Sequence, residues 1–167
     1  MPMHALITGG ARSGKSAFAE ARVAAQGGRP VYLATAEPRD EEMRARIAAH
    51  VARRGDAWET RHEPVDLPGA LAATDGAPRL VDCLTLWLSN LLERGLDPEA
   101  ETARLTDALA AQASPVTFVT NEIGLGMVPM DRLARAFRDA HGTLNQTIAA
   151  ACDELHLVVA GQPLRIK

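Results

Sequence analysis

The residue pattern with the most specific chemistry in this sequence is a phosphate-binding loop near the N-terminus. Residues 9–16 fit the pattern G-x-x-x-x-G-K-S. Glycines in such a loop let backbone N–H groups cradle a β-phosphate, and the helix that follows adds its positive N-terminal end. Lys15 is predicted to be catalytic by reaching the β- and γ-phosphates, and the Ser16 hydroxyl to bind Mg²⁺. The predicted nucleotide-binding residues here are Gly9, Gly10, Ala11, Arg12, Ser13, Gly14, Lys15 and Ser16.

The residues on either side of the loop support this interpretation. An apolar run at 4–8 is typical of a strand, and residues 17–23 are typical of a helix. Lys15 and Lys167 are the only lysines among 18 basic residues, so a chance match to the motif is improbable. The alternative is a glycine-rich turn that happens to fit the pattern.

A second acidic element is expected to complete a magnesium site. The short apolar run 79–81 ends at Asp82, which could hold Mg²⁺ directly or through water. The alternative is that Asp82 caps the helix that begins near residue 84. We predict a metal site formed by Ser16 and Asp82.

The segment 40–54 has helical periodicity. Met43, Ile47 and Val51 recur at four-residue spacing, which predicts a stripe facing the core. An adjacent stripe carries a histidine between arginines, a pattern suited to an anion: Arg46, His50, Arg53 and Arg54. A neutral imidazole can attack phosphorus. From the spacing alone, however, a solvated surface histidine is the more common explanation for His50.

The remaining pattern predicts an α/β fold with a mostly parallel sheet and helices on both faces, the P-loop NTPase (RecA-like) architecture. Strand-like runs alternate with helical ones, and a last antiparallel edge strand is expected at 164–167. Ligands in such sheets lie at the carboxyl ends of the strands, which here are residues 9–16, 35–38, 82–85 and 121–126. The expected strands are 5–8, 30–35, 79–82, 115–120 and 154–160, and the expected helices are 15–26, 40–54, 84–94, 98–112 and 131–152.

Length and composition set further limits. The 167 residues predict one domain, and a net charge of −3 gives no basic footprint for nucleic acid. Cys83 and Cys152 lack metal-ligand spacing and are expected to be reduced core thiols. With no leader-like or membrane-spanning run, a cytoplasmic protein is expected. The segment at 120–123 is not a guanine-reading N-K-x-D box, which argues against a regulatory GTPase.

Nearly the whole chain resembles one family, the bifunctional adenosylcobinamide kinase / adenosylcobinamide-phosphate guanylyltransferases. This resemblance implies phosphorylation of adenosylcobinamide by ATP or GTP, followed by transfer of GMP from GTP to the resulting phosphate. It further implies a GMP-histidine intermediate on His50, Mg²⁺ as cofactor and a homotrimer. The segments that carry the resemblance are ITGGARSGKS, YLATAEPRDEEMRARIAAH, RGDAW, VDCLTLWLSNLL, TNEIGLGMVP and RLARAFRDAHGTLNQTIAAACDELHLVVAG.

The resemblance also implies further nucleotide contacts. They fall after the second strand, just after His50, and in the segment before Pro64: Ala34, Thr35, Ala36, Val51, Ala52, Arg53, Arg54 and Glu63. Asp82, at the end of the expected strand 79–82, is also predicted among the nucleotide-binding residues. Three alternatives stay open from the residues alone. They are a simple P-loop kinase with no covalent nucleotide, a nucleotide-sensing module without turnover, and a family member that keeps one activity.

Overall fold

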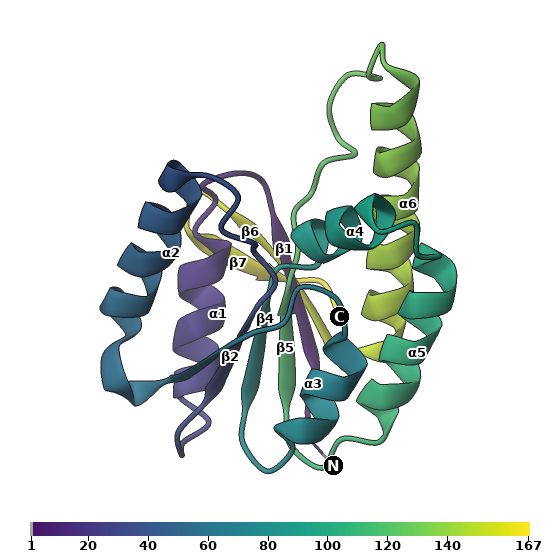
Figure 1. Cartoon of the computed structure of the whole chain (residues 1–167). Helices are drawn as coiled ribbons and strands as arrows, with labels where there is room; N and C mark the ends of the chain where they lie inside the picture. Colours follow the sequence, from purple (N-terminus) through teal and green to yellow (C-terminus); the bar gives the residue numbers. More distant parts are fainter. Residues whose placement is uncertain (1) are drawn as a thin grey trace.

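The computed structural model describes residues 2–167, apart from the side chain of Arg46, and is built around a seven-stranded sheet (Figure 1). The strand order is β3-β2-β4-β5-β1-β6-β7, and every neighbouring pair is parallel except β6 and β7. The strand that precedes the phosphate loop, β1, therefore lies one strand away from β4, with β5 between them. The strands are β1 Ala5–Gly9, β2 Val31–Ala34, β3 Glu59–His62, β4 Arg79–Asp82, β5 Val116–Val119, β6 Glu154–Val159 and β7 Gln162–Arg165.

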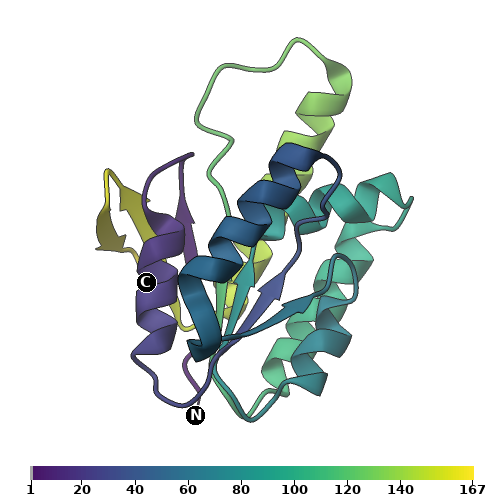
Figure 2. The same ribbon diagram turned by 60° about the vertical axis from the view of Figure 1, so that its left-hand side comes forward.

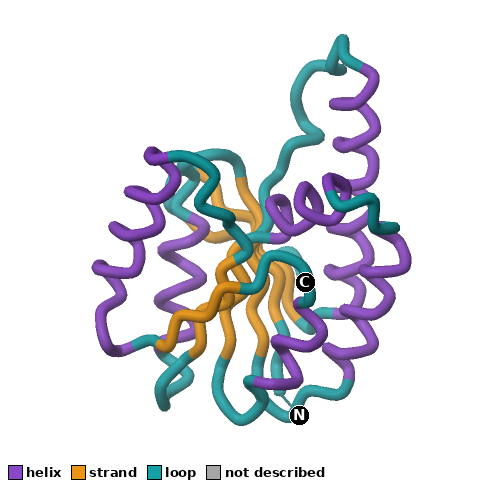
Figure 3. Tube along the Cα trace, in the orientation of Figure 1, coloured by secondary structure: helices purple, strands orange, loops and turns teal. Residues whose placement is uncertain are grey.

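Helices cover both faces of this sheet (Figures 2 and 3). Two of them, α1 and α2, lie on one face, and the other four lie on the opposite face (Figure 1). The helices are α1 Lys15–Ala24, α2 Glu41–Arg54, α3 Leu67–Ala73, α4 Leu84–Glu93, α5 Pro98–Ala110 and α6 Arg132–Ala151, with a 3₁₀ turn at Gly55–Ala57. None of the helices in residues 2–167 has the length and apolar character needed to cross a membrane.

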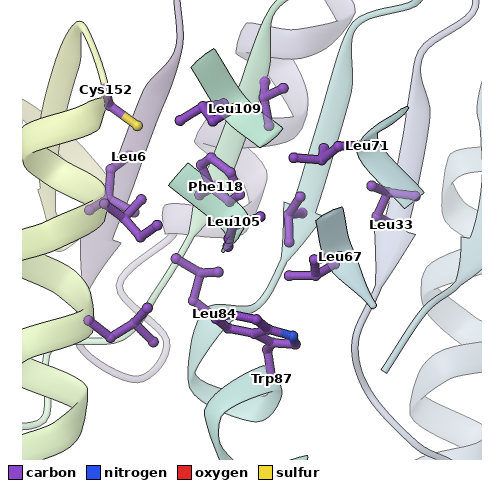
Figure 4. Packing of buried hydrophobic residues seen from close by; sticks show 14 of the residues in the cluster. Leu6, Leu33, Leu67, Leu71, Leu84, Trp87, Leu105, Leu109, Phe118 and Cys152 are labelled. Carbon is purple, nitrogen blue, oxygen red and sulfur yellow. The ribbon is translucent and has the colours of Figure 1, made fainter. Parts of the chain in front are cut away.

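The larger hydrophobic core lies between the sheet and helices α3 to α6 (Figure 4). Trp87 and Phe118 are fully buried there, and the Trp87 indole N–H donates a 2.7 Å hydrogen bond to Val65 O. Each such side chain contributes roughly 1.5–3 kcal/mol through burial. A second cluster lies on the face of α1 and includes Ile7, Val23 and Tyr32. Both faces of β1 and β2 are thus packed, which explains their continuously apolar sequences.

The expected alternation of strands and helices is confirmed, as is the antiparallel edge strand, which begins two residues earlier than expected. Cys83 and Cys152 are free and buried, as expected for core thiols. Two elements were missed. The edge strand β3 reads Glu-Thr-Arg-His and has no apolar run, and the seven-residue α3 contains Pro68 and Gly69. Neither carries the periodic apolar signal from which the other elements were predicted.

A buried arginine joins the loops at the amino ends of β4 and β5. Arg79 has no exposed surface, and its guanidinium donates to Asp75 Oδ1 at 3.0 Å and to Gln112 Oε1 at 2.6 Å. The Asp75 carboxylate also accepts hydrogen bonds from the backbone N–H groups of Ala113 and Ser114. The Ala113 N–H and the Arg79 guanidinium together lower the pKa of Asp75 to about 2. Asp75 therefore closes this end of the sheet as a charged group.

Replacing Asp75 with asparagine is expected to lower the free energy of unfolding by about 2 kcal/mol, because it leaves the buried Arg79 charge uncompensated. A folded-state pKa below the ordinary 3.8 means that this contribution is complete above pH 4 or so and is lost as pH falls towards 2. Urea titrations at pH 7 and at pH 3 measure both effects. The exposed Asp107 on α5 provides the control, and Asp107→Asn is expected to change stability by less than about 0.5 kcal/mol.

Candidate active site

The phosphate loop connects β1 to α1 and depends on two glycines. A Cβ on Gly9 would lie 2.6 Å from both Ser13 Oγ and Val158 O, so any side chain there clashes with backbone. Gly14 has a φ of +92°, and a Cβ on it would lie 3.1 Å from the Cα of Gly161 in the turn between β6 and β7. These two motif positions accept only glycine in this fold, which the spacing of the sequence motif predicted.

Backbone contacts hold the loop closed over the end of β1. The Gly161 N–H donates a 2.7 Å hydrogen bond to Ser13 O, and the Ser13 N–H donates to Gly10 O. The Lys15 ammonium donates a 3.2 Å hydrogen bond to the same carbonyl of Gly10 and therefore lies over the loop. Helix α1 begins at Lys15, so its N-terminal end faces the loop. Ala11 and Arg12 form the exposed tip.

A cavity of about 310 Å³ lies next to the loop, bounded by α2 and by residues at the carboxyl ends of β2 and β4. It brings together residues predicted from three separate parts of the sequence. The Ser16 hydroxyl comes from the phosphate loop, the Asp82 carboxylate from β4, and the His50 imidazole from α2. The sequence-predicted residues that line it are Ser16, Ala34, Ala36, His50, Val51, Arg54 and Asp82.

Other predicted nucleotide contacts make structural interactions outside this lining. Thr35 is buried, and its hydroxyl bonds with the backbone N–H and C=O of Cys83, both at 2.8 Å, which joins the ends of β2 and β4. Arg53 forms an ion pair with Glu20 of α1, and Ala52 is exposed. The Glu63 carboxylate accepts hydrogen bonds from the backbone N–H groups of residues 65 and 66. Nucleotide contacts by these four side chains stay predictions.

Helix α2 forms the outer wall of the cavity. It begins after Asp40, whose side chain accepts a 2.7 Å hydrogen bond from the Met43 N–H as an N-cap. The predicted core-facing stripe was wrong, because Met43, Ile47 and Val51 line the cavity and Val51 is 40% exposed. The helical period was correct, but an apolar stripe packs equally well against a ligand cavity. The side chain of Arg46, predicted on the neighbouring stripe, lies outside the described residues.

Asp82 lines the cavity and is not the cap of the helix that follows it. Cys83 occupies the N-cap position of α4 and provides no side-chain cap. The Asp82 carboxylate lines the cavity with Ser16, and its Oδ2 accepts a 2.8 Å hydrogen bond from the Tyr32 hydroxyl. A hydroxyl and a carboxylate are hard oxygen donors that suit Mg²⁺, which completes its shell with water and phosphate oxygens. The two side chains therefore fit a magnesium ion bound together with a nucleotide.

Arg54 brings a buried positive charge to the same cavity. Its side chain is 3% exposed, and its Nε and Nη1 atoms have no hydrogen-bond partner among the described residues. The nearest carboxylate oxygen, on Glu20, lies 3.7 Å from Nη1. Buried N–H groups in folded proteins are nearly always paired, so this guanidinium is suited to receive acceptor oxygens from a ligand.

Asn121 also lines the cavity. The sequence placed it only within the segment 121–126, at the carboxyl end of an expected strand, and did not single it out as a site residue. Its backbone and side-chain N–H groups both contact Thr85 Oγ1, at 3.1 and 3.0 Å. That hydroxyl is 2.9 Å from the Nε2 atom of the buried His141, whose pKa is lowered by burial. Asn145 Nδ2 donates to Asn121 O. Asn121 is thus held rigidly at the end of β5, between the phosphate loop and Asp82.

Comparison with known proteins connects this geometry to a family. The family described as Cobinamide kinase / cobinamide phosphate guanyltransferase matches residues 5–166. The chain belongs to this family of bifunctional enzymes. It is 46% identical over 172 residues to the bifunctional adenosylcobalamin biosynthesis protein CobP of Pseudomonas aeruginosa, covering 99% of this chain and 98% of that protein. It is 40% identical over 188 residues to CobU of Salmonella typhimurium, covering 99% and 100%.

The cobinamide kinase / guanyltransferase chain shares its fold with more distant proteins of known structure. The flagellar accessory protein FlaH from Methanocaldococcus jannaschii matches with a TM-score of 0.55 at 11% identity, over 99% of this chain and 78% of that one. The RadB recombinase matches with a TM-score of 0.54 at 16% identity, over 93% and 73%. These likenesses confirm the predicted fold class.

Proposed function

We propose that this chain phosphorylates the aminopropanol hydroxyl of adenosylcobinamide with ATP or GTP and then transfers GMP from GTP to the resulting phosphate. The products are adenosylcobinamide-GDP and pyrophosphate. Membership of the family supports both reactions. The observation that carries the second reaction is that His50 lines the same cavity as Ser16, Asp82 and Arg54. The proposed nucleophile, the phosphate-loop serine and the buried arginine therefore line one cavity.

The guanylyl step is proposed to proceed in two displacements at the α-phosphorus. An imidazole nitrogen of His50 attacks, a P–N bond forms, and the bond to the leaving pyrophosphate breaks. A phosphate oxygen of adenosylcobinamide phosphate then attacks the same phosphorus and releases the imidazole. Lys15 and Arg54 neutralise the charge that develops on the polyphosphate. Mg²⁺ bound by Ser16 and Asp82 would supply further charge neutralisation.

The test of the proposed function is product analysis with the purified chain. With adenosylcobinamide, ATP and Mg²⁺, chromatography is expected to show the phosphorylated corrinoid, and addition of GTP is expected to convert it to adenosylcobinamide-GDP. Phosphorylation without guanylylation would identify a plain P-loop kinase. Nucleotide binding with neither product would identify a nucleotide-binding module.

We also propose that the protein is a cytoplasmic homotrimer. An apolar segment that joins β5 to α6 projects from the body of the molecule (Figure 2). Leu125, Met127 and Met130 on it are between 84% and 97% exposed. Exposed apolar surface of this kind is typical of subunit contacts. Sedimentation equilibrium is expected to give about three times the chain mass of 17.8 kDa, and a monomer across the micromolar range would contradict the trimer.

A further inference from the structure

Two charged side chains that line the cavity, Asp82 and Arg54, both contact the same aromatic side chain, Tyr32. Tyr32 lies on β2 and is buried. Its hydroxyl donates a 2.8 Å hydrogen bond to Asp82 Oδ2. Its ring lies against the guanidinium of Arg54, whose Cζ atom is 3.4 Å from the ring centroid. A single side chain therefore contacts both the predicted metal ligand and the buried cation.

The contact with the ring holds Arg54 through the face of its guanidinium, in addition to the ion pair with Glu20. Cation–π contact fixes the plane of the guanidinium through its face, while hydrogen bonds would use its edge. The edge atoms Nε and Nη1 are buried and have no hydrogen-bond partner among the described residues, and Nη1 lies 3.7 Å from Glu20 Oε1 in an ion pair. The side chain is thus held in place at the wall of the cavity that it lines. This arrangement lowers the ordering cost of binding, because the arginine is positioned before the ligand arrives.

The hydroxyl has a similar effect on Asp82. The Tyr32 hydroxyl donates its hydrogen bond to a carboxylate oxygen, which can only accept one. The hydroxyl binds Asp82 Oδ2. Among the described groups of residues 2–167, none donates a hydrogen bond to Asp82 Oδ1. Partners of this kind orient metal-ligating carboxylates, and their loss typically weakens metal binding about tenfold or more.

The Tyr32 ring is itself fixed by packing. Trp58, which follows the 3₁₀ turn after α2, meets it edge-on, with ring centroids 6.2 Å apart and an interplanar angle of 77°. Trp58 is also buried, and it belongs to the same hydrophobic cluster as Tyr32. The tryptophan contacts the ring without lining the cavity.

We propose that Tyr32 is a positioning residue that orients both charged groups of the nucleotide site, with its hydroxyl setting the Asp82 carboxylate for Mg²⁺ and its ring setting the Arg54 guanidinium for phosphate. The inference rests on the proposed function, because it assumes that a magnesium–nucleotide complex occupies the cavity. Tyr32 itself lines the cavity, and its proposed role is to act through Asp82 and Arg54.

Calorimetric binding of GDP separates the two contacts of Tyr32. In excess EDTA, Tyr32→Phe is expected to bind GDP within twofold of the wild type, because the ring under Arg54 is kept. On addition of Mg²⁺, the wild type is expected to bind GDP more tightly. The factor by which Mg²⁺ tightens GDP binding is expected to be at least about threefold smaller in Tyr32→Phe than in the wild type. An unchanged gain in Tyr32→Phe overturns the role of the hydroxyl.

Tyr32→Leu removes the ring as well. GDP binding in EDTA is expected to weaken about fivefold or more, since the guanidinium loses its support. The same change in an Arg54→Ala background is expected to have less than a twofold effect, because the tyrosine acts through the arginine. Equal effects in both backgrounds overturn the role of the ring. If Tyr32→Leu does not fold, judged by its thermal unfolding, Tyr32→Met is used in the same cycle.

Trp58→Phe is the matched control. It alters the packing of the Tyr32 ring while leaving the hydroxyl and the contact with Arg54 in place, so both GDP measurements are expected to stay within twofold of the wild type. Failure of the wild type to bind GDP or GTP at all would instead contradict the proposed function. The two failures are therefore distinguishable.

Discussion

Replacement of Lys15 with alanine is expected to reduce both phosphorylation and GMP transfer by a factor of about 10²–10³ in kcat/KM. Its ammonium lies over the phosphate loop and donates a hydrogen bond to Gly10 O. From there it can reach the β- and γ-phosphates of a bound nucleotide, whose charge grows in the transition state. Loss of one preorganised donor at such a position typically costs this much. Steady-state rates of both reactions with saturating corrinoid measure the effect.

Lys167→Ala is the control for this experiment, since Lys167 is the other lysine of the chain. Its ammonium donates to backbone carbonyls at the end of α6, including Cys152 O at 2.6 Å. Lys167→Ala is expected to lower stability slightly and to leave both activities within about twofold. Retention of more than a tenth of the wild-type activity by folded Lys15→Ala would contradict the assignment of residues 9–16 as the phosphate site.

Replacement of His50 with alanine is expected to separate the two activities. GMP transfer should fall by at least about 10⁴, because removal of a covalent nucleophile eliminates the pathway. The rate of phosphorylation should stay within about threefold of the wild type, because this reaction needs the phosphate loop and Asp82 but no covalent nucleotide. Parallel assays with ATP alone and with GTP on preformed adenosylcobinamide phosphate measure each step.

His62 supplies the control for the histidine experiment. It lies exposed on the edge strand β3, and His62→Ala is expected to leave both activities unchanged. If His50→Ala loses both activities to the same extent, the histidine has a structural or binding role. If His50→Ala loses neither activity, His50 is a solvated surface residue of the helix.

The loop at residues 9–16 has the geometry expected from its sequence, because local constraints determine it. Gly9 and Gly14 are required by close contacts and by a positive φ within a short stretch of chain, so their spacing is a physical signature. The parallel sheet is equally predictable, since buried strands are continuously apolar. The position of Asp82 follows from the same rule, because the carboxyl ends of parallel strands share one edge.

The wall formed by α2 could not be derived in this way. The apolar period of Met43 and Ile47 identifies a helix face but not what that face contacts, and here it contacts the cavity. Helical spacing alone therefore left His50 more typical of a surface residue. The contact between Arg54 and Tyr32 joins residues 22 positions apart, and it depends on how α2 lies over the sheet. Such contacts are set by tertiary packing, which single-sequence patterns do not encode.

The most direct test of the central claim is the mass of the intact protein after incubation with GTP and Mg²⁺ in the absence of corrinoid. We expect an acid-labile increment of one GMP on the wild type, its disappearance on addition of adenosylcobinamide phosphate, and no increment on His50→Ala. Absence of the increment on folded wild-type protein that phosphorylates adenosylcobinamide would contradict the covalent mechanism.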